Sequence, residues 1–238
     1  MAKLKVLGSG SKGNAYIIEC DNETLLVELG IPFLDILRGL GFNTSNVVGC
    51  LCSHLHGDHS LSIKNAIKSN LRVYSCKQVA SKFDGVEALT ERKKHKIGGF
   101  TVTPLSVPHS VECYSFIIEH NEFGKLVFCT DCIDFPYKVK CCHHLLCECN
   151  WDMEVIIDNA FEEDYVRSMH EEHMEKLQTL EVLRRHFNVD LQNIVLLHMS
   201  SNNILPKATR DFMRRELGFN NVFLGRRGIE IELNKSEF

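Results

Sequence analysis

The chain has 238 residues, 44% of them hydrophobic, which is enough apolar material to bury a large core as one domain, residues 1–238. Its net charge of -4 argues against a surface built for long nucleic acid, which normally shows a basic stripe. Residues 1–7 lack the apolar core of a signal peptide, and no apolar run approaches the ~20 residues of a membrane span. The odd count of 11 cysteines then favours reduced thiols in a cytoplasm over a disulfide framework.

Short apolar and β-branched runs predict strands along the first part of the chain. A glycine-containing loop at 8–14 interrupts them. This loop lacks the Gly-Lys-Ser/Thr ending of a P-loop, so we interpret it as a tight turn bordering a site. We expect strands at 4–7, 15–20, 24–29, 47–52 and 71–75, and helices at 62–69 and 77–82.

The second part of the chain again alternates strands with a few helices. We expect strands at 100–107, 115–119, 125–129, 144–147 and 193–197. Apolar residues at helical spacing predict a helix at 174–187, and another spans 206–217, with Pro206 near its start and Gly218 past its end. Strands dominate each half, so an α/β sandwich of two sheets with helices outside fits best.

Four potential metal ligands fall within six residues: His54, His56, Asp58 and His59. Imidazole and carboxylate are the groups that a hydrolytic metal centre needs. Residues two apart do not share a helical face, so we expect a tight loop in which Gly57 turns all four inward. A polar loop in solvent is the alternative, but this density of ligand types favours metal binding.

Three further candidates, His109, Asp131 and His198, each follow a predicted strand. Ligands at strand ends can converge on one edge of a sheet, where the scaffold is rigid. Each alone would most often be a capping or surface residue. Together with the upstream cluster, they predict one shared centre.

The order His-x-His-x-Asp-His, then a distant His, Asp and His, resembles the metallo-β-lactamase-fold hydrolases. Residues 7–14, 125–131 and 197–200 are similar to this family's opening loop, aspartate strand and closing histidine motif. The resemblance implies an αββα four-layer sandwich with two divalent metal ions along one edge. It implies that one metal binds His54, His56 and His109, that the second binds Asp58, His59 and His198, and that Asp131 bridges them.

One position departs from the family pattern. Many relatives carry Asp where this chain has Glu28, and that carboxylate would support a ligand rather than bind metal. Mixed nitrogen and oxygen ligation suits zinc or manganese, and the sequence does not choose between them.

Further residues resemble one branch of the fold. Flavodiiron oxidoreductases carry Glu where this chain has His56, so His56 favours hydrolysis. His198, with Ser200 two residues on, is similar to tRNase Z and related phosphodiesterases. Glu148 and His173 resemble this branch's Glu/His couple, in which the histidine is the general acid. A carboxylate-held His can protonate an alkoxide near neutral pH. Alternatively, Glu148 caps a strand and His173 is solvated. We assign catalytic roles to Asp58, Glu148 and His173.

Length separates the members of this branch. The chain has no room for the domain that β-CASP nucleases insert, nor a Gly/Pro-rich segment for the tRNA-gripping arm of tRNase Z proper. A small WalJ-like group with proposed exonuclease activity and the compact cyclic-nucleotide phosphodiesterases are the nearest fits. We therefore expect a phosphodiesterase acting on a nucleotide or short nucleic acid, with no membrane partner, and relatives make a homodimer possible.

Two other functions stay open. A glyoxalase- or lactonase-like ester or thioester hydrolase would share the His-rich run but would not need the Glu148/His173 proton donor for a thiolate leaving group. A non-catalytic metal-binding protein is the second alternative, which the seven competent ligand positions disfavour.

Two remaining clusters have ordinary explanations beside functional ones. The cysteine-rich segment could hold a structural zinc, but only Cys129 and Cys132 have C-x-x-C spacing, so buried thiols are favoured. Basic side chains near the C-terminus could contact phosphate, although a solvated face is more common. These are Lys207, Arg210, Arg214, Arg215, Arg226 and Arg227.

Overall fold

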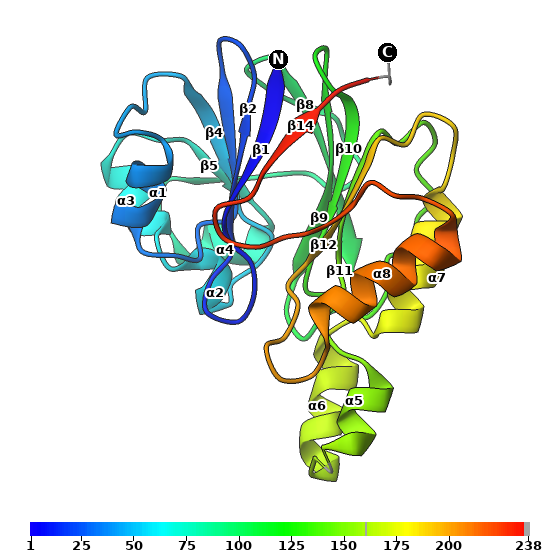
Figure 1. The fold of residues 1–238 in the computed structure, drawn as a ribbon. Coiled ribbons are helices and arrows are strands. Elements are labelled where there is room, and N and C mark those ends of the chain that lie inside the picture. Colours follow the sequence, from blue (N-terminus) through cyan, green and yellow to red (C-terminus); the bar gives the residue numbers. More distant parts are fainter. Residues whose placement is uncertain (160, 236–238) are drawn as a thin grey trace.

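The computed structural model describes residues 1–159 and 161–235 and contains two seven-stranded sheets that pack face to face (Figure 1). In the first sheet, four neighbouring strands pair antiparallel and the remaining pairs are parallel. Its strands are, in spatial order, β14 (Glu230–Leu233), β1 (Ala2–Gly8), β2 (Ala15–Glu19), β3 (Thr24–Val27), β4 (Val47–Leu51), β5 (Val73–Ser75) and β6 (Val86–Ala88).

The second sheet repeats this plan of antiparallel pairs followed by parallel pairs. The carboxyl ends of its parallel strands therefore meet at one edge, where polar side chains from several strands can gather. Its strands are β13 (Val222–Leu224), β12 (Asn193–Leu197), β11 (His144–Glu148), β10 (Gly124–Cys129), β9 (Cys113–His120), β8 (Phe100–Val107) and β7 (His95–Ile97).

Helices cover the outer faces of both sheets, which gives the expected four-layer αββα sandwich. On the first sheet lie α1 (Phe33–Gly39), α3 (Ile63–Lys68) and α4 (Lys77–Lys82), and on the second lie α7 (Lys176–His186) and α8 (Pro206–Leu217). The short helix α2 (Gly57–Ser60) follows β4 at one end of the sandwich. Beyond that end extend α5 (Met153–Asp158) and α6 (Glu163–Glu172) (Figure 1).

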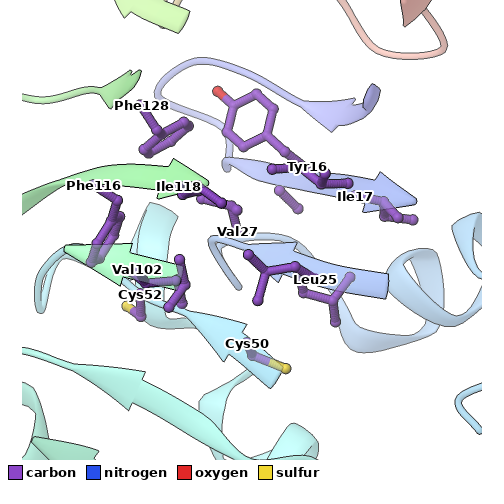
Figure 2. Close-up of a cluster of buried hydrophobic side chains, with 14 of the residues drawn as sticks. Tyr16, Ile17, Leu25, Val27, Cys50, Cys52, Val102, Phe116, Ile118 and Phe128 are labelled. Carbon is purple, nitrogen blue, oxygen red and sulfur yellow. The ribbon is translucent and has the colours of Figure 1, made fainter. Parts of the chain in front are cut away.

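The main hydrophobic core lies between the sheets and joins both halves of the chain. Figure 2 shows Tyr16 and Leu25 of the first sheet facing Phe116 and Phe128 of the second. The Tyr16 and Phe128 rings pack edge to face, with 5.2 Å between their centroids. Phe128 is 1% exposed, so it contributes nearly its full area to this core.

Strands β10 and β12 are buried on both faces, which explains their unbroken apolar sequences. Leu126 and Phe128 of β10 face the core between the sheets, while Val127 and Cys129 face a second core beneath α7 and α8. Alternation between two apolar environments is expected for central strands covered by helices. The ends of these strands are therefore firmly held, and the residues that directly follow them start from a fixed backbone position.

Most predicted elements are confirmed, with boundaries shifted by a few residues. Elements 77–82, 100–107, 193–197 and 206–217 match, and Gly218 closes α8 in the left-handed conformation, with φ 62°. The helix predicted at 174–187 begins later, at Lys176, because Glu175 caps it in a capping box with Gln178. The short or strongly polar elements α1, α5, α6, β6, β7, β13 and β14 were not predicted.

The prediction for the ligand run was partly wrong. Gly57 begins the helical turn α2, which carries Asp58 and His59, and it does not use a backbone conformation closed to other residues. The four side chains can still converge, because only Asp58 and His59 are on the helical turn. His54 and His56 lie in the extended segment before it. Within 1–159 and 161–235, the helices are all too short or too polar to span a membrane.

Phe128→Ala should lower the free energy of unfolding by about 3–5 kcal/mol, because it leaves a large cavity between the sheets. Denaturant unfolding followed by circular dichroism measures the change. The control is Phe42→Ala, whose ring is 65% exposed, with an expected change within about 0.5 kcal/mol. Equal losses for both variants would contradict the packing described.

Candidate metal centre

All seven predicted ligand residues come together at one end of the sandwich. They lie in the segment after β4 and on α2, and directly beyond β8, β10 and β12. Among the sets of side chains whose potential ligand atoms lie within 4.8 Å of one another, two consist of these seven residues alone, and Asp131 belongs to both. The first ligand group is His54, His56, His109 and Asp131, and the second is Asp58, His59, Asp131 and His198.

The first ligand group presents three imidazoles around one point. His109 Nε2 lies 3.1 Å from His56 Nδ1, and His54 Nε2 lies 3.7 Å from Asp131 Oδ2. The centroids of the His54 ring and the His56 ring are 4.7 Å apart, and the two rings are nearly perpendicular. Nitrogen atoms at these separations can share one cation without backbone movement.

The second ligand group surrounds the other side of Asp131. His59 Nε2 lies 3.1 Å from Asp131 Oδ2, and His198 Nδ1 contacts Asp131 Oδ1. Asp58 Oδ2 lies 3.4 Å from His59 Nε2 and 3.7 Å from His198 Nε2. Asp131 Oδ2 therefore lies between His54 of the first ligand group and His59 of the second, as a bridging ligand would require.

Unpartnered buried nitrogens test whether the site fits a metal ion. His54 Nε2 and His198 Nε2 are buried and have no hydrogen-bond partner. Buried polar atoms without partners are costly and uncommon in proteins. A divalent cation would use these lone pairs, so the donor set fits a metal of the zinc or manganese type.

Burial and charge together set the protonation of the site. Burial lowers the pKa of His54 well below its usual value, and neighbouring His59 lowers it further, which favours the neutral ligand form. Burial alone would raise the pKa of Asp131, but His198 and His59 hold it well below its usual value. Asp131 is therefore ionised, as a metal ligand must be.

His198 shows the opposite balance. Burial lowers its pKa, but the charge of Asp131 and hydrogen bonds to Asp131 and Glu148 raise it to about 10. In this arrangement His198 carries a positive charge next to two carboxylates. A divalent cation would take over that neutralising role and displace the proton.

Backbone strain collects at the centre. Glu28, Asp131 and His198 have φ angles of 66°, 47° and 46°, in the left-handed region that residues other than glycine rarely adopt. Such conformations cost of order 1–3 kcal/mol each and persist where the surroundings fix them. Here the strain turns each side chain back across the end of its strand and toward the ligand groups.

Neighbouring polar groups orient the ligand rings. The Ser53 hydroxyl lies 2.8 Å from His54 Nδ1. Glu28 Oε2 faces His59 Nδ1 at 3.3 Å without a well-aligned hydrogen bond, and the backbone N–H of Ser53 donates to both Glu28 oxygens at 3.3 Å. Glu28 thus supports a ligand, although it is one carbon longer than the aspartate of many relatives.

Two supporting residues were missed by sequence reasoning. Asn14 Nδ2 lies 2.9 Å from His59 Nε2, and Asn14 also accepts the backbone N–H of Gly10 at 2.9 Å. Glu172 Oε2 lies 3.3 Å from His109 Nδ1 and accepts the Ser110 hydroxyl at 2.9 Å. The position of Asn14 in the opening loop was the available signal for one, whereas Glu172 looked like part of a solvated acidic run.

Gly30 fixes how close α2 comes to the first sheet. A Cβ atom at Gly30 would lie 1.5 Å from the carbonyl oxygen of Asp58, so no larger residue fits. The same carbonyl accepts the backbone N–H of Asn14 at 2.8 Å. This close packing holds Asp58 and His59 against the opening loop.

Glu148 and His173 form a pair beside the second ligand group. His173 Nδ1 lies 2.7 Å from Glu148 Oε1, and the other Glu148 oxygen accepts the backbone N–H of Cys132 at 3.0 Å. Glu148 Oε1 also lies 3.3 Å from His198 Nδ1. His173 is the residue that ends α6, in the connection to α7, and Trp151 Nε1 donates to its carbonyl oxygen.

The charge of Glu148 sets the pKa of His173. Burial lowers the pKa of His173, but the negative charge of Glu148 and their hydrogen bond raise it above its usual value. Burial likewise raises the pKa of Glu148, and His173 lowers it overall. The pair therefore favours a protonated imidazole held by an ionised carboxylate.

Two cavities adjoin the site. One of about 190 Å³ has His173, Glu172, Asn150 and Tyr165 among its lining residues. Another of about 340 Å³ follows the opening loop past Lys12 and reaches Arg227. Together they offer polar and basic surface on either side of Ser11, which lines both.

The cysteine-rich segment places sulfur close to the centre without forming a disulfide. Cys129 Sγ and Cys132 Sγ lie 3.2 Å apart and flank Asp131, and every cysteine except Cys141 is buried. Among residues 1–159 and 161–235, the groups suited to metal binding include no set from this segment. These thiols fill the second core, together with Cys147 and Cys149.

Most of the C-terminal basic residues have protein partners. Arg210 bonds Asp211, and Arg214 donates to the carbonyl oxygen of Val222 at 2.9 Å. Arg227 lies at the mouth of the larger cavity, where its nearest acidic oxygen, on Asp35, is 3.7 Å away. Of the six, Arg227 is thus the residue best placed for a ligand.

Comparison with known proteins identifies the fold. No protein-family profile matches the sequence, and no curated protein matches it. YhfI, a metallo-β-lactamase-fold protein from Bacillus subtilis, matches with a TM-score of 0.71 at 18% identity, over 98% of this chain and 100% of that one. A diphosphatase of the PhnP family matches with a TM-score of 0.70 at 15% identity, over 99% and 100%.

The short form of human tRNase Z gives a TM-score of 0.62 at 14% identity, over 97% of this chain and 99% of that one. Likeness at this level of identity establishes architecture. The chain therefore has the metallo-β-lactamase fold that the sequence resemblance implied.

Asp131→Ala should remove most bound metal, because both ligand groups lose a member and the buried histidines lose their counter-charge. Metal content after purification with zinc or manganese, measured by plasma mass spectrometry, tests this. Asp134→Ala is the matched control, since Asp134 lies three residues on and its side chain is 47% exposed. Metal content equal to that of the unaltered protein in Asp131→Ala would exclude Asp131 as a ligand.

Proposed function

We propose that the protein is a metal-dependent hydrolase that cleaves a phosphodiester bond in a nucleotide or short nucleic acid, with residues 1–238 acting as one domain. Two divalent ions, zinc or manganese, would occupy the two ligand groups. Support comes from the shared carboxylate of Asp131 between those groups. The fold is also that of a PhnP-family diphosphatase and of tRNase Z.

The observation that carries the phosphodiesterase proposal is the Glu148/His173 pair. Its 2.7 Å contact sits directly against the second ligand group, because Glu148 Oε1 also reaches His198 Nδ1 at 3.3 Å. A phosphodiester releases an alkoxide, which is a poor leaving group and needs a proton. A carboxylate-held imidazole adjoining the ligand groups supplies that proton.

Divalent ions held by the two ligand groups would supply Lewis-acid activation of water and neutralise charge on the phosphoryl oxygens. The protein's own residues provide the rest. Asp131 and the histidines fix the geometry through the strained ends of β10 and β12. Asp58, whose side chain is 25% exposed, has a carboxylate oxygen beside His59 and His198 and can accept the proton of the attacking water.

His173 acts on the other side of the scissile bond. Glu148 holds Nδ1, so Nε2 carries the proton that passes to the leaving oxygen. Glu148 is fully buried and is itself fixed by the N–H of Cys132, so the imidazole keeps one orientation. The cavity lined by His173 and Tyr165 would receive the leaving nucleoside.

Substrate size is constrained by the cavities and by charge. Volumes of about 190 Å³ and 340 Å³ suit single nucleotide units. The net charge of -4 disfavours a long duplex. A cyclic nucleotide and the end of a short single strand both satisfy these limits.

The alternative is a glyoxalase- or lactonase-like hydrolase of esters or thioesters. The fold accommodates such reactions, so the two functions have to be distinguished by the residues of the site. A thiolate leaves without a proton, so the Glu148/His173 pair would have no purpose in thioester hydrolysis. The pair thus favours the phosphodiester over the thioester, and direct assay decides between a phosphodiester and a lactone.

His173→Ala should slow hydrolysis of phosphodiesters with alkoxide leaving groups by about 10²–10⁴-fold, because the general acid is lost. Cleavage of bis-p-nitrophenyl phosphate should fall much less, since p-nitrophenolate leaves without protonation. Kinetics on both substrates measure the difference. His170→Ala, on the same helical segment, is the control. Equal slowing of both substrates would contradict the acid role.

A substrate panel tests the proposal as a whole. Cyclic mononucleotides, short single strands, duplex DNA, a thioester and a lactone should be assayed with zinc or manganese supplied. We expect turnover of small phosphodiesters and its loss with a chelator. Turnover confined to the thioester or lactone would replace the proposed function with the alternative.

A further inference from the structure

A second cluster of metal-ligating side chains lies at the opposite end of the sandwich. Cys20 follows β2, His120 ends β9, and Glu122 lies in the turn before β10. Their potential ligand atoms lie within 4.8 Å of one another, and Cys20 Sγ is 3.2 Å from His120 Nδ1. We call these three residues the far-end cluster.

Hydrogen bonds fix the tautomer of His120. Its Nε2 lies 3.0 Å from Glu23 Oε1, and an ionised carboxylate only accepts, so Nε2 carries the proton. The backbone N–H of Glu122 donates to Nδ1 at 3.2 Å, so Nδ1 is the unprotonated nitrogen, and a metal ion would have to replace this long hydrogen bond. Metal-binding histidines use this arrangement, with one nitrogen for the metal and the other donating to a carboxylate.

The imidazole is also held in place. The Phe100 ring and the Phe123 ring lie 4.7 Å and 5.6 Å from the His120 ring, centroid to centroid. Glu23 is fixed in turn, since the N–H of Gly99 donates to both of its oxygens at 3.0 Å and 2.8 Å. The donor atom of His120 is therefore preorganised toward Cys20 and Glu122.

Negative charge accumulates at the far-end cluster. Glu122 Oε2 is buried without an aligned hydrogen bond, and the N-terminal ammonium lies 3.3 Å from it. Burial, followed by the charges of Glu122 and Glu23, raises the pKa of the Cys20 thiol to about 12. A bound cation would offset these charges and stabilise the thiolate.

We propose that Cys20, His120 and Glu122 bind a zinc ion, separate from the candidate metal centre. Thiolate, imidazole and carboxylate are all zinc ligands, and thiolate selects against manganese and magnesium. Sulfur and nitrogen ligands of tetrahedral zinc lie about 3.5 Å apart, close to the distance present here. The thiol proton passes to solvent as the sulfur–zinc bond forms, and water completes the four ligands.

The position of the far-end cluster would let this ion link the two sheets. Cys20 continues β2 of the first sheet, while His120 belongs to β9 of the second. Zinc bound here would tie the two sheets together at the end that carries the N-terminus (Figure 1). The candidate metal centre already joins them at the other end.

Cobalt(II) tests the proposal, because it replaces zinc and shows a near-ultraviolet charge-transfer band when bound by thiolate. The seven residues of the candidate metal centre contain no sulfur, so they cannot produce this band. We expect the band in the cobalt-loaded protein, its absence in Cys20→Ser, and its retention in Cys50→Ser, a control at another buried cysteine. Zinc should bleach the band.

Glu122→Gln provides a second variant on a part-exposed turn, where folding is not at risk. Titration of the band should show cobalt affinity reduced about tenfold or more. A folded wild-type protein that takes up cobalt without the band would overturn the proposal. A band of equal strength in Cys20→Ser would do the same, because the sulfur would then come from another residue.

Discussion

The rest of the site depends on the interaction of the buried Asp131 carboxylate with the histidines around it. Burial opposes its charge, and histidines from both sheets stabilise it: His59 from the segment after β4, and His198 from the end of β12. The backbone of Asp131 is held in the left-handed region, at φ 47°. Both conditions require that β10 end at a fixed point, and its apolar residues, packed in two cores, ensure this.

The parallel order of β10, β11 and β12 then places the polar residues that follow or end these strands next to one another. Glu148 pairs in register with Leu197, so it ends its strand next to His198. From there Glu148 holds His173, which reaches the site from the connection between α6 and α7. The edge of the second sheet thus carries His198, Asp131 and Glu148, the residues proposed as a ligand, a bridging carboxylate and the partner of a proton donor. The segments that follow the first sheet carry most of the candidate imidazole ligands. The division follows from strand order and needs no mobile loop.

The sequence predicted correctly those elements that are determined by a local pattern of residues. The dense run His54 to His59 indicated metal. Alternating apolar residues located β8, an unbroken apolar run located β12, and Pro206 and Gly218 marked the ends of α8. Prediction failed where the determinants are distant. Asn14 meets Asp58 across 44 positions and Ser110 meets Glu172 across 62, and no periodicity reports such contacts. The polar helices α5 and α6 lack a long apolar stripe, and the turn at α2 depends on Gly30, far upstream. Whether the seven candidate residues bind metal is still a prediction.

Crystals grown with excess manganese would test the central claim most directly, through anomalous scattering at the candidate metal centre. Two peaks should flank the Asp131 carboxylate, one among His54, His56 and His109 and the other among Asp58, His59 and His198. Each should lie within coordination distance of its ligand atoms. If the crystal is well ordered and these side chains are in place, the absence of any anomalous peak beside Asp131 would contradict the account.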